Sequence, residues 1–339
     1  MREINEGKDG FSFWTHFPLD DLDSEKIVKQ ISTFNHDLEM NVIKTMPNGL
    51  FAIEDWISEL VDYSDVAKGG VAKIHEITYE DLIEKMISKD LTVTSGAYKR
   101  EIDSIIQLRD SLSPNTEMIC TVFTPLTLLK KLFPRHLPLL MNSSVKEKMD
   151  QIAAKIMAVT KEYIEAACSS GCAGFFFANQ AVDFHYQHPE IYQEYGLKME
   201  RELVDFIHQQ HKYIILHLHG QIKSTDILKQ FNVEGYSWHI DESDVTIDDF
   251  HKEMPIDKVI FGGLSRTLIT EGKVDEVLSQ VDTYLQGAYN RQIIFAPECV
   301  IRHPINMPVL TEITGYIKER MNQKSNANQI DSFPWVEQY

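Results

Sequence analysis

The sequence predicts an α/β fold, a single (β/α)8 barrel of the TIM type. Two observations predict it: short apolar runs alternate with longer amphipathic stretches from end to end, and the apolar runs number eight. Seven helical regions separate the runs and one more follows the last, which is the count of a closed barrel. The chain of 339 residues has no glycine- or serine-rich linker, so one domain is expected.

The eight expected strands are the short apolar runs. In chain order they cover Phe11–Phe17, Met40–Met46, Glu117–Phe123, Ala173–Asn179, Tyr213–His219, Gly235–Asp241, Lys258–Leu264 and Gln292–Glu298. The connection from about Asn48 to Thr116 is too long for one helix. Extra helices are therefore expected in this second βα connection.

The clearest helices are expected at Ser144–Ala167 and Pro189–Gln210, where apolar residues recur at three- and four-residue spacing. Pro189 stands in the first turn of its helix, a position that helix starts prefer. A last helix, Met307–Met321, follows the eighth strand. The barrel is expected to cover residues 1–323, and a tail at 324–339 begins polar and ends in FPWVEQY.

Charge and composition limit the classes of partner. The chain has 33 basic and 51 acidic residues, a net charge of −18, which argues against binding nucleic acid or an anionic membrane surface. No apolar run approaches the roughly 20 residues of a membrane span, and the polar start MREINEGKDG has no signal-peptide core. Four cysteines are too few for a disulfide scaffold of this size. A cytoplasmic protein that acts on a small molecule is expected.

Polar residues gather where the expected strands end, and in such barrels the active site lies at that rim. The catalytic candidates are Asp183 and His239, and the substrate-binding candidates are His16, Asn179, Trp238, Arg266 and Arg302. Arginine is suited to holding a carboxylate or a phosphate. Each of these residues, taken alone, is also consistent with an ordinary loop residue whose hydrogen bonds are satisfied.

His217 and His219 form the most specific pair. Residues i and i+2 of a strand point to the same face, and two imidazoles against packed helices would each need partners, so the barrel axis is favoured. Cys299, at the end of the eighth strand, opens onto the same rim. Two nitrogens and a thiolate leave one position free on a tetrahedral zinc ion, as in catalytic sites. The alternative is a histidine pair that binds substrate or forms hydrogen bonds.

Several segments of the chain, in order, match those of one known superfamily. They are Thr124–Leu129, Ala173–Gln180, His188–Tyr192, Ile214–Gly220, Phe261–Arg266 with Gly272, and Ile294–Ile301. Through them the chain resembles the uroporphyrinogen decarboxylase superfamily, which includes porphyrinogen decarboxylases and zinc-dependent cobamide:thiol methyltransferases. The resemblance covers about Phe11 to Arg320, is more specific in the second half, and implies a barrel that frequently dimerises.

Two departures from the superfamily patterns bear on activity. The decarboxylases carry an arginine-rich first loop for substrate carboxylates, and this chain has no arginine or lysine between Asp9 and Glu25. The methyltransferases hold zinc with a His-x-Cys pair and a distant cysteine, and this chain matches at His217 and Cys299 but has His219 at the third position. A single thiolate would leave the metal a stronger Lewis acid.

Three functional hypotheses follow. The resemblance implies zinc-dependent methyl transfer between a corrinoid, carried by a partner protein, and a substrate thiol. The alternative is a metal-free decarboxylase or other lyase acting on a small carboxylated substrate rather than uroporphyrinogen, with Arg266 or Arg302 as anion clamp and a histidine or Asp183 as acid. The third is a barrel that has lost catalysis and binds a ligand, which the clustered ionisable residues argue against.

Overall fold

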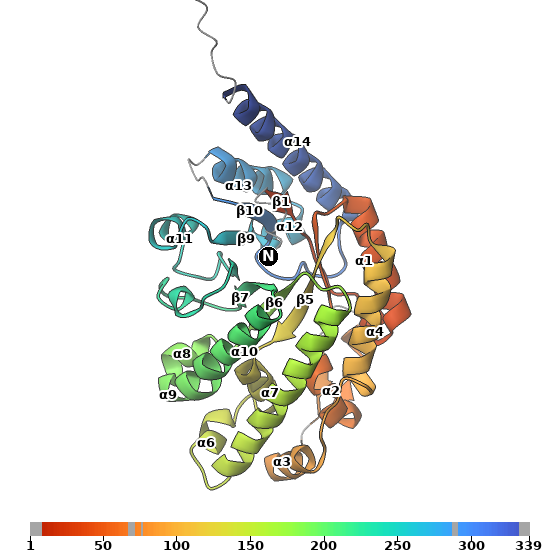
Figure 1. Cartoon of the computed structure of the whole chain (residues 1–339), viewed down its shortest axis with the longest axis vertical. Coiled ribbons are helices and arrows are strands. Elements are labelled where there is room, and N and C mark those ends of the chain that lie inside the picture. The colour runs from red at the N-terminus through yellow and green to blue at the C-terminus, as the bar shows by residue number, and fades with distance from the viewer. Residues whose placement is uncertain (1–8, 67–71, 76, 287–290, 332–339) are drawn as a thin grey trace, which may run out of the picture.

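Eight parallel strands form the centre of the computed structural model, which describes residues 9–66, 72–75, 77–286 and 291–331 (Figure 1). The strands are β1 (Gly10–Phe11), β2 (Val42–Lys44), β5 (Glu117–Phe123), β6 (Gly174–Asn179), β7 (Tyr213–Leu218), β8 (Gly235–Trp238), β9 (Val259–Leu264) and β10 (Ile293–Pro297). Their order in the sheet is β1-β10-β9-β8-β7-β6-β5-β2, and every pair is parallel. The two end strands meet where the Asn41 amide donates to the Phe11 carbonyl at 3.3 Å. The predicted eight-stranded barrel is thereby confirmed.

Two strands, β1 and β8, end three or more residues earlier than predicted. After Phe11 the first segment forms an isolated bridge, between Thr15 and Ile301, with the chain that follows the last strand. Its aromatic residues are buried by side-chain packing, without a continuous ladder of backbone hydrogen bonds. A buried segment of this kind has the same apolar pattern as a strand, so the sequence predicted a longer strand. The chain leaves β8 after Trp238 because it turns there, with the Glu242 amide donating to the His239 carbonyl.

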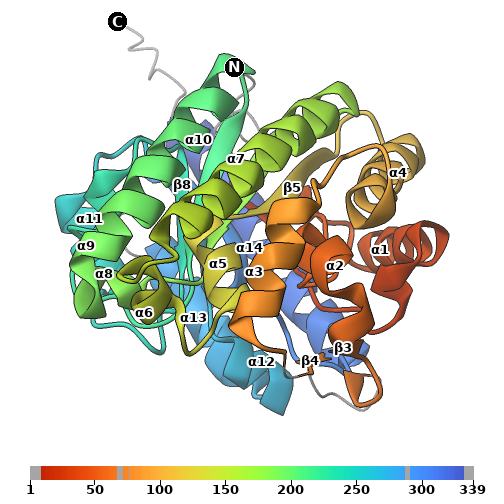
Figure 2. The same ribbon diagram turned by 90° about the horizontal axis from the view of Figure 1, so that it is seen from below.

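Helices surround the sheet. They are α1 (Ser24–Leu38), α2 (Phe51–Ile57), α3 (Tyr79–Ser88), α4 (Gly96–Ser111), α5 (Pro125–Leu132), α6 (Leu137–Met141), α7 (Lys146–Ser169), α8 (Asp183–Gln187), α9 (Pro189–Ile191), a π-helical turn (Tyr192–Leu197), α10 (Lys198–Gln209), α11 (Ile247–Glu253), α12 (Arg266–Glu271), α13 (Val274–Gln286) and α14 (Met307–Asp331). Helices α7 and α10 run side by side on one flank, and α1 packs on α4 (Figures 1 and 2). Within the described residues, no helix combines the length and the apolar character that crossing a membrane requires.

The second connection contains extra helices, as predicted. It holds α2, α3 and α4 together with a small antiparallel ribbon of β3 (Val61–Asp62) and β4 (Lys73–Ile74), which Figure 2 shows on one side of the molecule. Helix α14 continues ten residues beyond the predicted Met321, so the expected boundary at residue 323 falls within a helix. The FPWVEQY segment lies outside the described residues.

Aromatic side chains from β6, β9 and the segment after β1 fill the barrel interior below the rim. Trp14 stacks on Phe261 with ring centroids 5.7 Å apart, and its edge meets Phe176 at 5.5 Å. All three rings are almost completely buried. Offset and edge-to-face contacts of this kind stabilise a core beyond the area they bury, and they give the site above them a rigid floor.

Candidate metal centre

Four side chains converge at the rim of the barrel: His217 at the end of β7, His219 just after it, His239 after β8 and Cys299 after β10. One ligand atom of each lies within 4.8 Å of the others. Cys299 Sγ is 3.7 Å from His219 Nδ1, and the His219 and His239 rings lie 4.2 Å apart. We call these four residues the donor group. The three residues that the sequence predicted as metal ligands therefore lie together, and His239 joins them.

The topology brings these residues together. Parallel strands end at the same edge of the sheet, so residues that follow β7, β8 and β10 share one rim. The strands β7 and β8 are adjacent, with His217 paired to Ser237, and only β9 separates β8 from β10. A small barrel diameter then lets the Cys299 thiol reach the histidines across β9.

Burial controls the protonation of the donor group. It lowers the pKa of His217 well below the ordinary value and, helped by the nearby His239, lowers that of His219 to about 4. It also raises the pKa of the Cys299 thiol. The imidazoles are therefore neutral, which is the form that binds a metal ion.

The arrangement of ring nitrogens fits a zinc ion. His217 Nδ1 lies 3.0 Å from the Ser237 hydroxyl, which leaves Nε2 for a ligand. His239 is completely buried, and its Nε2 has no hydrogen-bond partner in the described part of the chain. An orphaned buried nitrogen costs about 1–3 kcal/mol. Ligands of a tetrahedral zinc ion lie about 3.5 Å apart, so small side-chain movements would complete the site.

A carboxylate and a guanidinium support His239 from behind. Glu242 Oε2 lies 3.1 Å from His239 Nδ1, and the other oxygen accepts a hydrogen bond from Arg266 at 3.0 Å. Although burial opposes it, the contact with His239 lowers the pKa of the Glu242 carboxyl. Arg266, predicted as a substrate clamp, thus has a carboxylate partner next to the donor group.

Asn179 lies behind the donor group and faces α10. Its side-chain amide donates to the Glu200 carboxylate at 3.1 Å, its side-chain oxygen accepts from the Ala181 amide, and its carbonyl accepts the His219 amide at 2.9 Å. Both Asn179 and Glu200 are completely buried. Asn179 therefore holds the loop that carries His219, and its assignment to substrate stays a prediction.

The Glu200 carboxyl makes stability depend on pH. Burial raises its pKa to about 7, from an ordinary value of 4.5. The folded chain thus keeps a proton that the unfolded chain loses, so this contribution is complete below pH 4.5 and is lost as the pH rises towards 7. We expect Glu200→Gln, which cannot ionise, to gain about 2–3 kcal/mol over the wild type between pH 5 and pH 7.5. Denaturant unfolding at both pH values measures this difference, and parallel pH dependence in the two proteins would contradict it.

Trp238 points away from the barrel axis. Its ring stacks on Phe250 of α11 with centroids 5.1 Å apart, and its Nε1 donates to the Val245 carbonyl at 3.1 Å. The neighbouring Ser237 faces the axis beside His217, and successive residues of a strand face opposite sides. This position does not support the prediction that Trp238 contacts substrate.

The remaining predicted residues are spread over the rim. Asp183 begins α8 and pairs with Lys130 at 2.6 Å, outside the donor group. Arg302 is exposed after β10. His16 is partly buried, and burial together with the charges of Lys44 and Lys131 lowers its pKa to about 4.

Several ionisable groups were not among the predicted site residues. Glu298 is buried, accepts a hydrogen bond from the Asp241 amide at 2.9 Å, and has a pKa raised to about 7 by burial. Lys44 belongs to an otherwise apolar strand, and Lys131 follows Lys130 at the end of α5. A lysine inside the run Val-Ile-Lys is a sequence signal for Lys44, whereas Glu242 carries no such signal because it lies in a turn.

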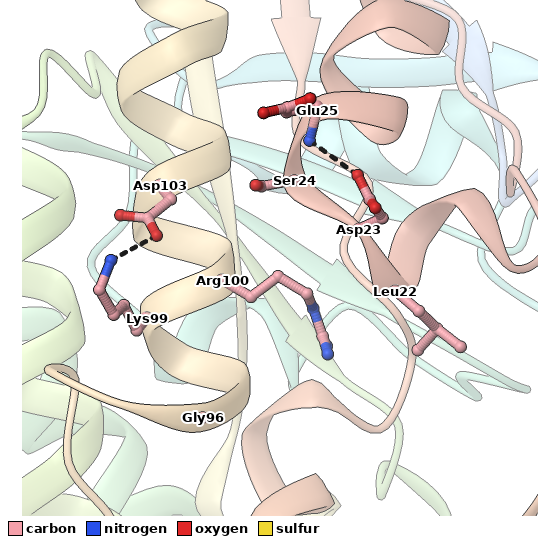
Figure 3. A pocket seen from close by; sticks show the side chains of 8 residues that line it. All are labelled: Leu22, Asp23, Ser24, Glu25, Gly96, Lys99, Arg100 and Asp103. Atoms are coloured by element: carbon pink, nitrogen blue, oxygen red, sulfur yellow. Dashed lines mark hydrogen bonds and ion pairs between the residues drawn. The ribbon is translucent and has the colours of Figure 1, made fainter.

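A cavity of about 470 Å³ lies at another place, between the starts of α1 and α4 (Figure 3). Its basic residues have acidic partners: Lys99 pairs with Asp103 at 2.5 Å, and Arg100 pairs with Glu54 at 2.7 Å. None of the donor group lines it. It therefore adds nothing to the candidate metal centre.

Comparisons with known proteins agree with this architecture. Residues 63–319 match the family described as Uroporphyrinogen decarboxylase (URO-D). A methyltransferase from Methanosarcina mazei is similar in structure, with a TM-score of 0.74 at 12% identity over 93% of this chain and 96% of that one. A candidate vitamin-B12-independent methionine synthase from Listeria monocytogenes has a TM-score of 0.51 at 14% identity, covering 88% of this chain and 86% of its own. No curated protein sequence matches the chain.

Proposed function

Because the chain belongs to the uroporphyrinogen decarboxylase family, we propose that it is a zinc-dependent methyltransferase that methylates a small thiol. The observation that carries the proposal is the donor group, four ligand atoms within 4.8 Å of one another at the rim. Three neutral imidazoles and one cysteine are ligands that zinc prefers. The structural similarity to a methyltransferase is consistent with this reaction.

We assign His217, His219 and Cys299 as the residues that would hold the metal. Zinc, when bound, lowers the pKa of a substrate thiol and so supplies a thiolate at neutral pH. The His217 ring is oriented by Ser237, which is the support that a ligating histidine commonly has. These three residues leave a fourth position for substrate.

We assign His239 as the base that takes the thiol proton. Its Nε2 is buried and has no hydrogen-bond partner among the residues that the structure describes. The Glu242 carboxylate beside Nδ1 would stabilise the imidazolium that forms. The S–H bond then breaks with its proton on His239, and the sulfur forms a bond to the methyl carbon. The bond between the methyl carbon and its donor breaks, and its electron pair stays on the donor.

A corrinoid carried by a partner protein is the methyl donor we propose. Methylcobalamin is the probe: its absorption spectrum should change when zinc-loaded enzyme and a thiol are added together. The control omits the thiol. If the methyl group transfers only from a methylated folate, the proposed methyl transfer would stand, but the corrinoid would be rejected as the donor.

Uroporphyrinogen is not expected to be a substrate. The stretch between Asp9 and Glu25 has no arginine or lysine to hold the carboxylates, and each lost charged hydrogen bond forfeits about 1.5–3 kcal/mol. Chromatography of porphyrins after incubation with the enzyme should detect no decarboxylated product. Turnover at about 1 per second or faster would show that other cations replace the loop.

Removing the carboxylate behind His239 should lower activity without removing any of the residues that would hold the metal. We expect Glu242→Gln to lower methyl-transfer activity by roughly 10-fold to 100-fold, as changes to groups that support a metal site commonly do. Glu84→Gln, at an exposed ion pair on α3, is the matched control. Equal activity of Glu242→Gln and wild type would remove Glu242 from the mechanism.

A metal-free lyase that acts on a small carboxylated substrate is the second candidate. The buried Glu298 carboxyl, with its pKa raised to about 7, favours it because such a group can donate a proton near neutral pH. One measurement distinguishes the lyase from the zinc-dependent methyltransferase. Activity that persists after chelation, and in His217→Ala, would favour the lyase.

A further inference from the structure

We propose that Glu200, which lies on helix α10 outside the ring of strands (Figure 1), is a positioning residue for the candidate metal centre. It fixes the side chain of Asn179, and Asn179 in turn holds the loop that carries His219. The inference deepens the proposed function and rests on it, since it takes His219 as a metal ligand. Its structural part, the restraint that Glu200 places on His219, does not need the metal.

Glu200 is an acid on the apolar face of its helix. The other buried residues of α10 are Leu203, Val204 and Ile207, and Glu200 is as buried as they are. A carboxyl group in such a place is costly unless it forms hydrogen bonds. Both of its oxygens accept from the side-chain amide nitrogen of Asn179, at 3.1 and 3.2 Å. The contact with Asn179 therefore offsets the cost of an acid at this position.

Asn179 transmits this contact to His219. It is the last residue of β6 and is completely buried. Its side chain is held at both ends, because the amide nitrogen donates to Glu200 and the oxygen accepts from the Ala181 amide at 2.8 Å. Its backbone carbonyl accepts from the His219 amide at 2.9 Å. A side chain fixed at both ends leaves its backbone little freedom, so Glu200 restrains the carbonyl that holds His219.

His219 depends on this carbonyl because it lies just beyond the end of β7. The chain turns at the next residue, Gly220, which has a φ of 100°. A Cβ at Gly220 would lie 3.5 Å from Val182, so the turn packs on the loop that follows Asn179. His219 Nδ1 lies 3.7 Å from Cys299 Sγ. Ligand atoms must meet a metal ion to within about 0.2 Å, so a shift of this loop would weaken metal binding.

A π-helical turn, Tyr192–Leu197, stands directly before α10. Gly196 lets the turn pack closely, because a Cβ there would lie 2.9 Å from a carbon of the Tyr192 ring and 3.2 Å from a methyl group of Leu126 in α5. A π turn has i→i+5 hydrogen bonds, so the residues after it face a different side than an uninterrupted α-helix would give them. Such turns are frequent at functional sites. The turn therefore helps to set the direction in which Glu200 points.

Zinc affinity and the spectrum of the cobalt-substituted protein test the positioning role. Glu200→Leu removes both acceptor oxygens, whereas Glu200→Gln keeps one for Asn179. The control is Glu101→Leu, which removes a similarly buried acid from α4, where it accepts from Arg100 at 3.4 Å. We expect Glu200→Leu to weaken zinc binding by roughly 10-fold to 100-fold, as loss of a supporting group does, and to change the visible absorption of bound cobalt. Glu200→Gln and Glu101→Leu should keep the wild-type affinity and spectrum.

Hydrogen exchange in metal-free protein separates this inference from the proposed function. The His219 amide, followed by NMR, should exchange roughly 10-fold faster in Glu200→Leu than in wild type, the effect of one weakened hydrogen bond. It should exchange at the wild-type rate in Glu200→Gln. This pattern in a protein that binds no zinc would retain the restraint on His219 and reject the zinc proposal.

Two outcomes would reject the positioning role. The first is wild-type zinc affinity and wild-type exchange in a folded Glu200→Leu, which would leave the zinc proposal standing. The second is equal weakening of zinc binding in Glu200→Leu and Glu101→Leu, which would indicate a general loss of stability. Circular dichroism checks the fold of each variant. If Glu200→Leu unfolds, Asn179→Ala removes the same contact from the other side and gives an independent measurement.

Discussion

Wild-type protein purified without chelators should contain close to one zinc ion per chain, and His217→Ala should contain almost none. The substitution removes a nitrogen ligand from the donor group, and losing a direct ligand should weaken metal binding by more than the roughly 10-fold to 100-fold typical of supporting residues. Methyl transfer should fall to background with the metal. Elemental analysis and circular dichroism measure the two consequences, and the fold should survive because a catalytic site contributes less to folding than a structural one.

Three further variants make this result specific. Cys299→Ser should lose the metal like His217→Ala, whereas Cys168→Ser, a half-buried thiol away from the rim, should keep it. His239→Ala should keep most of the metal and still lose activity, since we assign it as a base. If chelator-free protein holds no transition metal, or if both ligand variants keep the wild-type content, the zinc proposal is wrong. Metal loss in His239→Ala would instead make His239 a fourth ligand.

Replacing Trp238 by alanine should destabilise the fold by about 3–5 kcal/mol, the usual cost of emptying a large buried aromatic site. The ring is 1% exposed, stacks on Phe250 and donates to the Val245 carbonyl. Trp238→Phe keeps the stacking and leaves that carbonyl unpaired, so it should cost about 1–3 kcal/mol. Denaturant unfolding measures both values.

Kinetics on the phenylalanine variant decide between packing and substrate contact. Because Trp238 faces α11 rather than the axis, Trp238→Phe should leave the KM of the thiol within about 2-fold of the wild type. A KM raised 10-fold, in a protein of nearly unchanged stability, would restore the original prediction that this ring touches substrate.

The barrel could be predicted because its signal is local. Each strand is a short apolar run and each long helix repeats its apolar residues every three or four positions, so β5 was predicted with its observed bounds. The predicted strand ends were wrong where residues are buried without pairing their backbone to a neighbouring strand. Phe13 and Trp14 are as buried as strand residues, yet they lie beyond the end of β1. Likewise, α14 continues past the predicted Met321, and there Lys324 pairs with Asp9, a contact that no periodicity records.

The candidate site likewise contains residues that the sequence could predict and residues whose orientation depends on strand pairing. His217 and His219 were predictable as a pair because alternation along a strand is a property of the backbone, and Cys299 because parallel strands end at one rim. Alternation also implies that Trp238 and His239 face opposite sides, but which one faces the axis depends on the register of β8 against β7. That register places Ser237 beside His217 and turns Trp238 towards α11.

The sequence by itself determined the fold class, the rim on which the donor group lies and three of the four residues of that group. Those features follow from periodicity and strand direction, which neighbouring residues encode. The tertiary structure alone decided that His239 completes the donor group, that Asn179 supports the loop of His219, and that Lys44 is buried against the rings of Trp14 and Phe176. Each of these depends on distances between residues far apart in the chain, and such distances are set only when the strands pair and the barrel closes.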